Sequence, residues 1–262
     1  MSGKIFTVII VLVVTSLYIF CANISEAIIV TDGLVSIWTF DASDMQGDTA
    51  KDAWGENDGT VSGEPQKVPG KIEEALQFDG AADQVNCGND ASLDITGEIT
   101  IDAWFYPTGS GDSTFPRIAD KSNDPGYDIP GYKVYLRPSE NYVLTLSAGG
   151  THEISTLAAN ADAWNYVAFV IDGKEWQLFL NGNWERWTRG DIPSSVANPL
   201  CIGNSPVAAR HFEGVIDEVK IYSRTLSEEE VQQNYESESN ILTAVEPASK
   251  LASTWASIKA GR

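Results

Sequence analysis

Residues 164–182 read WNYVAFVIDGKEWQLFLNG, and this stretch decides the fold class. Gly173 and Lys174 separate two apolar runs, and Asn181 and Gly182 close the second run. Short runs of β-branched and aromatic residues bounded by such dipeptides predict the two strands of a β-hairpin, followed by another turn. The centre of the chain is therefore expected to be β structure.

The same pattern continues outward in both directions. Further short runs alternate apolar and polar residues, with turn-forming residues between them, and helical periodicity is nearly absent. Strands without intervening helices predict an all-β fold, in which two antiparallel sheets pack face to face as a sandwich. The runs are LVSIWTFD (34–41), EEALQFDG (73–80), ITIDAWFYP (99–107), YKVYLRP (132–138), NYVLTLS (141–147), PLCIGN (199–204) and GVIDEVKIY (214–222).

One short helix is expected after the last strand, at residues 227–236, which read SEEEVQQNYE. Ser227 and Glu230 have the spacing of a capping box, in which each side chain accepts a hydrogen bond from a backbone N–H at the helix start. Glutamates in the first turn also suit the positive end of the helix dipole. We expect this helix to cap the sheets.

The composition excludes several classes of partner. The chain has 262 residues and a formal net charge of −20, with 37 acidic against 17 Lys and Arg residues. Such a surface is a poor match for nucleic acid, whose recognition needs clustered cations, and for an anionic membrane surface. Hydrophobic residues make up 43% of the chain, including 8 Trp, which is enough to bury a core and unlike a disordered acidic protein.

The two ends of the chain differ from its centre. Residues 1–27 contain Lys4 and an apolar run at 5–22, and they close on a small-x-small pattern typical of a secretory signal peptide. The run is longer than most signal cores, so an uncleaved membrane anchor is the alternative. Both predict a secreted, cell-surface or periplasmic protein. We assign residues 28–236 to one domain and 237–262 to a linker with a short amphipathic tail.

Several of these segments, in this order, resemble a known family. They are similar to the laminin G-like jelly-roll domains of the concanavalin A-like lectin/glucanase superfamily. The resemblance implies a two-sheet jelly roll and covers about residues 33–236, but it is not specific for function. The segments are LVSIWTFD (34–41), NDGTVSG (57–63), GKIEEALQFDG (70–80), ITIDAWFYP (99–107), WNYVAFVIDGKEWQLFLNGN (164–183), LCIGN (200–204) and FEGVIDEVKIYSRTLSEEEV (212–231).

The same superfamily includes β-glucan hydrolases, so the sequence has to be compared with the catalytic motifs of such enzymes. Those enzymes need two carboxylates that project from one strand face into a cleft. The sequence holds no E-x-D-x-x-E string and no G-x-S-x-G motif. Asp217 and Glu218 are adjacent in a predicted strand, so alternation predicts that they point to opposite faces. We therefore predict a non-enzyme.

The expected function is an exported binding or adhesion module, glycan-binding and calcium-stabilised. Its partner would be a glycan or an extracellular protein. The alternative is a structural or protein-interaction module of the cell surface with no sugar site.

The first candidate ligand site is the segment NWERWTRGD at 183–191. Trp184 and Trp187 lie in polar surroundings, and exposed flat aromatic rings suit stacking against sugars. Arg186 and Arg189 would then donate hydrogen bonds to hydroxyl or carboxylate groups. The alternative is that the two tryptophans pack on the edge of the sandwich.

A second candidate surface is the stretch 108–131, read as one long loop. It contains Asp112, Asp120, Asp124 and Asp128 together with several Gly and Pro residues. Loops of this length are often functional. The spacing of the acidic residues fits no EF-hand, and the alternative is that they are simply solvated.

A calcium site is expected at Asp217. Alternation in GVIDEVKIY (214–222) places Asp217 among apolar residues, on a face predicted to point inward. A buried carboxylate needs backbone N–H groups or a cation. The family resemblance places the first and last strands together and implies a structural calcium between Asp41 and Asp217. The alternative is that both residues cap turns.

Export leaves Cys87 and Cys201 in an oxidising compartment. An even pair there can form a disulfide. The alternative is two small buried side chains, which free cysteines commonly are.

Overall fold

The computed structural model describes residues 28–111, 113–123 and 130–237. The predicted signal peptide at 1–27, and all of the predicted linker and tail except Ser237, lie outside the described residues. Among the described residues, no helix is long and apolar enough to cross a membrane.

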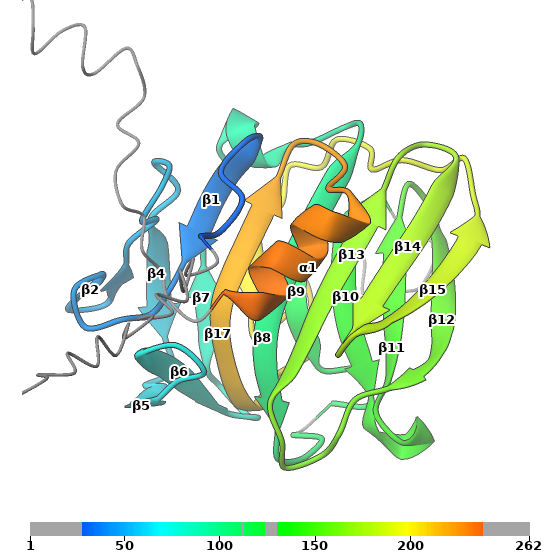
Figure 1. Ribbon diagram of the computed structural model, residues 1–262. Helices are drawn as coiled ribbons and strands as arrows, with labels where there is room; N and C mark the ends of the chain where they lie inside the picture. Colours follow the sequence, from blue (N-terminus) through cyan, green and yellow to red (C-terminus); the bar gives the residue numbers. More distant parts are fainter. Residues whose placement is uncertain (1–27, 112, 124–129, 238–262) are drawn as a thin grey trace, which may run out of the picture.

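The strands of the described residues form two antiparallel sheets packed face to face (Figure 1). Sheet A has eight strands in the order β15-β14-β13-β8-β17-β6-β5, with β1 paired to β17. Its strands are β1 (Leu34–Trp38), β5 (Gln66–Pro69), β6 (Glu74–Asp79), β8 (Ile99–Pro107), β13 (Asn165–Ile171), β14 (Glu175–Leu180), β15 (Asn183–Thr188) and β17 (Glu213–Tyr222).

Sheet B has nine strands in the order β12-β11-β10-β9-β16-β7-β4-β3-β2. Two short 3-10 helices lie at Ala91–Leu93 and Pro138–Glu140. The strands are β2 (Met45–Gln46), β3 (Thr49–Ala50), β4 (Gly59–Ser62), β7 (Gln84–Asn86), β9 (Arg117–Ser122), β10 (Gly131–Arg137), β11 (Val143–Ala148), β12 (Thr151–Ala158) and β16 (Cys201–Ile202).

The main core lies between the sheets, because alternation along each strand sends every second side chain inward. In β8, Ile101, Ala103 and Phe105 are buried in this core, whereas Trp104 belongs to a second apolar cluster on the outer face of sheet A. The predicted pairing of the first and last strands is confirmed, since Trp38 of β1 lies opposite Val219 of β17. The predicted all-β sandwich is therefore confirmed.

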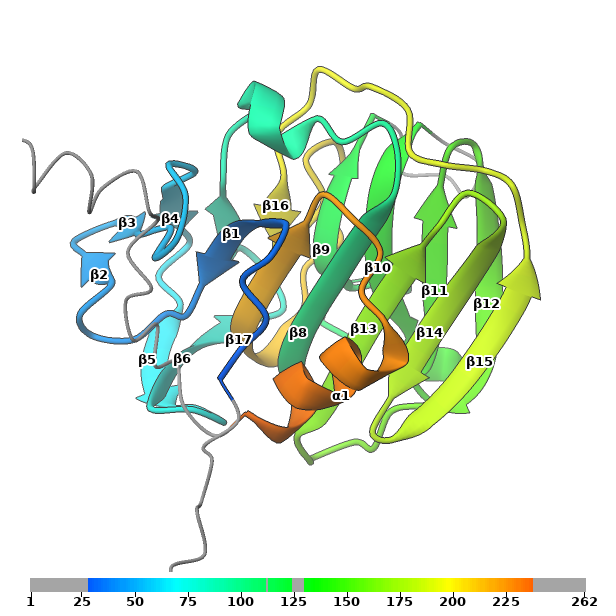
Figure 2. The same cartoon turned by 45° about the horizontal axis from the view of Figure 1, so that its top comes forward.

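The helix α1 (Glu228–Glu236) covers the outer face of sheet A over β8 and β13 (Figure 2). Val231 of α1 is fully buried in the second apolar cluster. The predicted capping box is present: Glu230 N donates to Ser227 Oγ at 3.2 Å, and Ser227 N donates to Glu230 Oε2 at 2.8 Å. The predicted C-terminal capping helix is thereby confirmed.

Two local expectations are wrong. The stretch 108–131 is not one long loop, because residues 117–122 form β9, a strand of sheet B, and Asp120 is fully buried within it. The alternation predicted for β17 also fails, because a bulge shifts its register between Asp217 and Lys220. Glu218 adopts a positive φ of 55° at this bulge.

The bulge changes which face each acidic residue occupies. Asp217 lies opposite Trp104 and so shares the outer face of sheet A, whereas Val219 returns to the main core. Glu218 does not point to the opposite face from Asp217, because its carboxylate lies 3.2 Å from the ammonium of Lys220 on the outer face. Asp217 therefore does not point into the core between the sheets.

Candidate binding and metal sites

The four residues of the predicted sugar site do not form one surface. They lie on or just after β15, at the edge of sheet A, where successive side chains point to opposite faces. Trp184 packs in the outer cluster, with its ring 5.1 Å from that of Phe179. Trp187 packs against the main core on the other face. Both rings are half-buried, so the edge-packing alternative describes their positions.

The two arginines are separated in the same way. The Arg186 guanidinium lies 5.3 Å from the Trp184 ring and forms an ion pair with Glu228 of α1. Arg189 forms an ion pair with Glu153 of β12, across the open edge between the sheets. Trp184 and Arg186 are therefore in contact with each other, beside an acidic helix, on the opposite side of the sheet edge from Trp187.

Asp41 and Asp217 converge on one turn of backbone, residues 70–74, which consists of the β5–β6 connection and the first residue of β6. Asp217 Oδ2 accepts hydrogen bonds from Lys71 N at 2.9 Å and Ile72 N at 3.1 Å. Asp41 Oδ1 accepts one from Glu74 N at 3.0 Å. Both carboxylates are buried, and they hold the same turn of backbone.

A glycine is required where this loop meets Asp217. A Cβ on Gly70 would lie 2.6 Å from Asp217 Oδ2, which is too close for any other residue. The backbone is also strained nearby, with positive φ at Phe40 (61°) and Glu73 (42°), each next to a residue of this site. Strained non-glycine residues cluster where the surrounding structure holds a functional geometry.

The charge around Asp217 is unbalanced among the described residues. Asp102, Asp217 and Glu218 are fully buried, and Lys220, buried to 1% exposure, is the cation among them. The Lys220 ammonium lies 3.2 Å from Glu218 and 3.6 Å from Asp102. Asp217 Oδ1 is buried and has no hydrogen-bond partner. Burial, followed by the charge of Glu218, raises the pKa of Asp217.

The unpartnered Asp217 oxygen and the surplus of buried carboxylates are consistent with a bound calcium ion. An orphaned buried carboxylate oxygen and an excess of buried acid are what an oxygen-binding cation would relieve. Among the described residues, no three His, Cys, Asp or Glu side chains are grouped to hold a metal ion. The residues fit calcium only if Asp41 and Asp217 are supplemented by backbone carbonyl or water oxygens, a shell that calcium accepts.

Cys87 and Cys201 are both buried free thiols in the structure, which matches the alternative of two small buried side chains and not the possible disulfide. The reason is the register of β7 with β16, in which Cys201 lies opposite Asn86 rather than Cys87. Directly opposite residues share a face, so Cys87 points into the main core and Cys201 points away from it. Burial raises the pKa of Cys201 to about 12, and Asp120 contributes to the rise.

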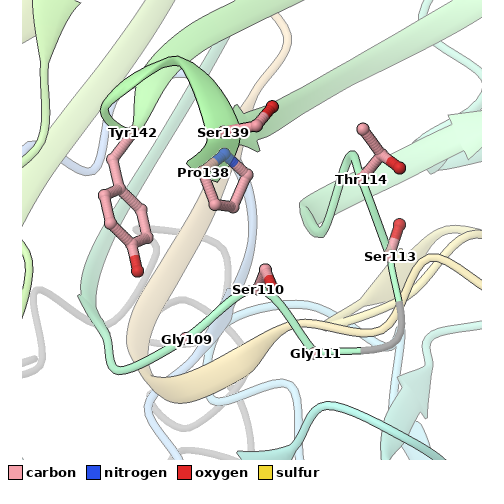
Figure 3. Close-up of a pocket in the computed structure, with 8 residues that line it drawn as sticks. All are labelled: Gly109, Ser110, Gly111, Ser113, Thr114, Pro138, Ser139 and Tyr142. Carbon is pink, nitrogen blue, oxygen red and sulfur yellow. The ribbon is translucent and has the colours of Figure 1, made fainter.

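A depression of about 650 Å³ lies between the loop that follows β8 and the turn between β10 and β11. In Figure 3 the rings of Pro138 and Tyr142 stand on one side of it, with Ser113 and Thr114 opposite. Its described lining consists mainly of hydroxyl-bearing and glycine residues, namely Gly109, Ser110, Gly111, Ser113, Thr114, Pro138, Ser139 and Tyr142.

Backbone strain fixes one side of the depression, and a partly buried hydrogen bond holds the other. Tyr142 and the preceding Asn141 both have positive φ, at 58° and 62°, so the turn is held in a conformation that is costly for these residues. On the other side, Gly111 N donates to Glu213 Oε2 at 2.8 Å. A Cβ on Gly109 would lie 2.1 Å from the same oxygen, so a larger residue at position 109 would have to displace the Glu213 carboxylate.

The sequence analysis does not predict this depression. It places residues 132–138 and 141–147 in two strands, and it considers 108–131 for its aspartates and not for its hydroxyl groups. A usable signal was present, since Ser110, Ser113 and Thr114 accompany two glycines in one short loop. Their proximity to Tyr142 depends on the pairing of strands that are distant in sequence. This pairing could not be predicted from the residues alone.

Comparison with known proteins places this geometry in context. The chain is 23% identical, over 150 residues, to the adhesion G-protein coupled receptor V1 of Danio rerio, a match that covers 53% of this chain and 2% of the receptor. The fold is similar to domain 4 of AbnA, an extracellular arabinanase from Geobacillus stearothermophilus in complex with arabinotriose. The TM-score is 0.55 and the identity 19%, over 78% of this chain and 98% of that domain.

A Trypanosoma rangeli sialidase in complex with sialic acid is also similar, with a TM-score of 0.58 and 14% identity, over 78% of this chain and 33% of the sialidase. Identities at this level show a shared fold alone. The family model of the laminin G-like type, described as the concanavalin A-like lectin/glucanases superfamily, matches residues 79–232, more than half of the chain. With the two-sheet sandwich and capped helix described above, this match shows that the chain belongs to the concanavalin A-like lectin/glucanase superfamily.

Proposed function

We propose that the domain is an extracellular, non-catalytic carbohydrate-binding module whose ligand occupies the depression beside Tyr142. The observation that carries the proposal is the lining itself, which combines two rings with hydroxyl groups on both sides of an open hollow. Sugars present apolar C–H faces that pack on rings, and hydroxyl groups that exchange hydrogen bonds with serine and threonine.

The absence of catalysis is part of the proposal. The described residues that line the depression include no carboxylate, imidazole or thiol group that could act as an acid, base or nucleophile. The adjacent acids Asp217 and Glu218 are fully buried on the outer face of sheet A, where a glycan could not reach them. The extracellular assignment draws support from the matches to an adhesion receptor and to an extracellular arabinanase.

The experiment compares two surfaces in one assay. The protein is screened on a glycan array, and the strongest ligand is then titrated against Tyr142→Ala and Trp184→Ala. Losing a stacking ring that dominates an interface can cost about 2 kcal/mol or more, so Tyr142→Ala should weaken binding by roughly thirtyfold or more. Trp184→Ala should bind like the parent protein.

Tyr142 also packs partly against the core, so folding needs a separate check. Ser139→Ala, an exposed change in the same lining, should weaken binding several-fold with no change in melting temperature. If Trp184→Ala alone abolishes binding, the ligand sits beside α1 and the depression is the wrong site.

The second candidate function is a protein-interaction or structural module of the cell surface with no sugar site. The observation in its favour is the match to part of an adhesion receptor. A protein that binds no glycan on the array, yet captures an extracellular protein through this domain, would favour this function over the first.

We also propose a structural calcium held by Asp41 and Asp217, together with backbone carbonyl and water oxygens. The orphaned Asp217 Oδ1 and the surplus of buried carboxylates support it. Because calcium would bind only the folded state, its removal should lower the melting temperature.

The measurement is a melting curve in EDTA, then with calcium or magnesium restored. Calcium should restore the melting temperature and magnesium should restore it poorly, because magnesium demands a smaller octahedral shell. Asp217→Asn should remove most of the calcium response, whereas Asp48→Asn, an exposed control, should keep it. A melting temperature indifferent to chelation would leave Asp41 and Asp217 as caps of the 70–74 turn.

A further inference from the structure

A buried amine and a buried carboxylate lie opposite each other in sheet A. Lys220 of β17 pairs with Asp102 of β8 in the strand register. Their side chains are 1% and 0% exposed, and Lys220 Nζ lies 3.6 Å from Asp102 Oδ1. That oxygen accepts no hydrogen bond. An amine and a carboxyl group held close together in a dry site are the two reactants of an amide bond, and such confinement speeds their reaction.

The β-bulge of β17 creates this pairing. If the register of the preceding residues continued, Val219 would lie opposite Asp102. The bulge adds one residue, so Lys220 takes that place instead. Glu218 carries the positive φ of 55° at the bulge, a costly conformation for a residue with a side chain. The strained backbone therefore aligns the amine with the carboxyl group.

Two neighbouring side chains are placed as an amide-forming reaction requires. Glu218 Oε2 lies 3.2 Å from Lys220 Nζ, close enough to accept a proton from the ammonium. Asn234 of α1 donates to Asp102 Oδ2 at 2.8 Å. This hydrogen bond would stabilise the negative charge that develops on Oδ2 when the carboxyl carbon is attacked. Oδ1, which lies nearer the amine, is then the oxygen that can leave.

The surroundings favour the product of such a reaction. Asp102, Glu218 and Lys220 are all buried, with at most 1% of each side chain exposed. Removing an ammonium and a carboxylate from water is costly even when the two ions pair. Condensation replaces both charges with one neutral amide and releases a water molecule. Burial therefore favours the amide over the ion pair.

We propose that Lys220 and Asp102 condense into an amide cross-link between β17 and β8, with Glu218 as the catalytic residue. Glu218 accepts a proton from the ammonium, and the freed amine attacks Asp102 Cγ to form the new C–N bond. The C–Oδ1 bond then breaks. Oδ1 leaves as water with two of the three ammonium hydrogens, which Glu218 relays, and the third stays on the amide nitrogen. Glu218 ends as it began, and nothing is oxidised or reduced.

The cross-link would belong to the fold and does not depend on the proposed sugar site. β8 and β17 are neighbouring strands of sheet A, between β13 on one side and β6 on the other (Figure 2). A covalent bond between them would persist when the chain is denatured, whereas an ion pair would dissociate. This difference makes the two states easy to tell apart.

The test is peptide mass spectrometry of the full-length protein after incubation at neutral pH. Trypsin cleaves after Lys and Arg, so it releases residues 72–117, which contain Asp102, and residues 211–220. A Lys220 that has become an amide is not cleaved. The expected product is 72–117 joined to 211–224, with a mass one water below the sum of the two peptides. Fragmentation of this product should place the link at Asp102 and Lys220.

Three variants assign the roles. Lys220→Arg keeps a positive charge but has no amine, so its peptides should stay separate. Glu218→Gln keeps the size of the side chain but cannot accept the proton, so its cross-link should form roughly a hundredfold more slowly or not at all. Glu228→Gln, which changes an exposed acid of α1, should be linked like the parent protein.

One result overturns the proposal whether or not a variant folds. If the parent protein yields only separate peptides of full mass, Lys220 and Asp102 form an ion pair and no amide. A Glu218→Gln variant that links as fast as the parent protein would overturn the catalytic role of Glu218. Denaturing electrophoresis gives a second measurement, in which the linked parent should migrate faster than Lys220→Arg because its loop from 102 to 220 stays closed. Equal migration would contradict the cross-link.

Discussion

The outer face of sheet A and the depression beside Tyr142 both concentrate polar residues, but these residues have different surroundings. Beneath α1, Asp102, Lys220 and Asn234 are buried and bind one another or nearby backbone. Around the depression, the described hydroxyl groups border an open hollow. We call the first group the helix-side network, comprising Asp102, Glu218, Lys220, Tyr222 and Asn234.

The difference indicates which residues serve the fold and which are available to a ligand. When two buried polar groups bind each other, removing one of them destabilises the protein strongly. The reason is that the other group is left buried without a hydrogen-bond or charge partner. Polar groups that border an open hollow at the surface can be changed with little loss of stability. Substitutions in the helix-side network should therefore destabilise the protein, and substitutions in the depression should change binding.

The largest loss of stability is expected for Lys220→Met. Removing this ammonium would leave Asp102 and Glu218 buried without a cation, and breaking a buried ion pair in this way costs about 3–5 kcal/mol. Urea unfolding measures the change, and Lys174→Met, at an exposed turn, should stay within about 0.5 kcal/mol of the parent protein. A loss below about 1 kcal/mol would show that water or another ion reaches these carboxylates.

A smaller loss is expected for Asn234→Leu. The Asn234 amide donates to Asp102 Oδ2 at 2.8 Å and to the Tyr222 hydroxyl at 2.9 Å, and its oxygen accepts from Val30 N at 2.8 Å. Leaving such buried groups unsatisfied costs about 1–3 kcal/mol. Because Asn234 joins α1 to the first described residues of the chain, hydrogen exchange at Val30 should also accelerate. Unchanged exchange there would contradict the link.

Ser227→Ala should cost about 1 kcal/mol, since it removes the N-cap acceptor of α1. Ser227→Asp should recover most of this loss, because aspartate also accepts from the N3 backbone. The free energy of unfolding in urea is the measurement. Equal stability of the alanine variant and the parent protein would mean that packing of Val231, rather than capping, fixes the helix start.

The smallest effect is expected for reduction of the protein. Cys87 and Cys201 lie on opposite faces of sheet B, so dithiothreitol should not change the melting temperature. Both thiols should resist iodoacetamide at pH 8 in the folded state and react in denaturant, because burial raises the pKa of each thiol. A mass two hydrogens lower than the reduced form would instead show a bridge.

The sequence predicted the parts of the fold that depend on local pattern. Alternation and turn dipeptides predicted the β14 and β13 hairpin, and the Ser227 and Glu230 spacing predicted the start of α1. The bulge at Glu218 was not predictable in this way. A bulge adds one residue to a strand, so every later residue in the strand points to the other face, and the alternation does not show where the extra residue lies.

The candidate sites also show that local sequence patterns do not predict contacts between distant segments. Asp41 and Asp217 were paired by the order of strands that the family resemblance implied, and the structure brings both to the 70–74 loop. Trp184 and Trp187 were joined by proximity along the chain, although an odd separation within a strand sends them to opposite faces. The depression depends on contacts between distant segments of the chain, which no local pattern encodes.

The most direct test of the central claim is chemical-shift mapping of the isotope-labelled protein with the best ligand from the glycan array. The proposed site predicts that the largest shift changes fall in residues 109–114 and 138–142, and that α1 and Trp184 are unaffected. Changes confined to α1 and β15, or scattered without a centre, would contradict a sugar site in the depression.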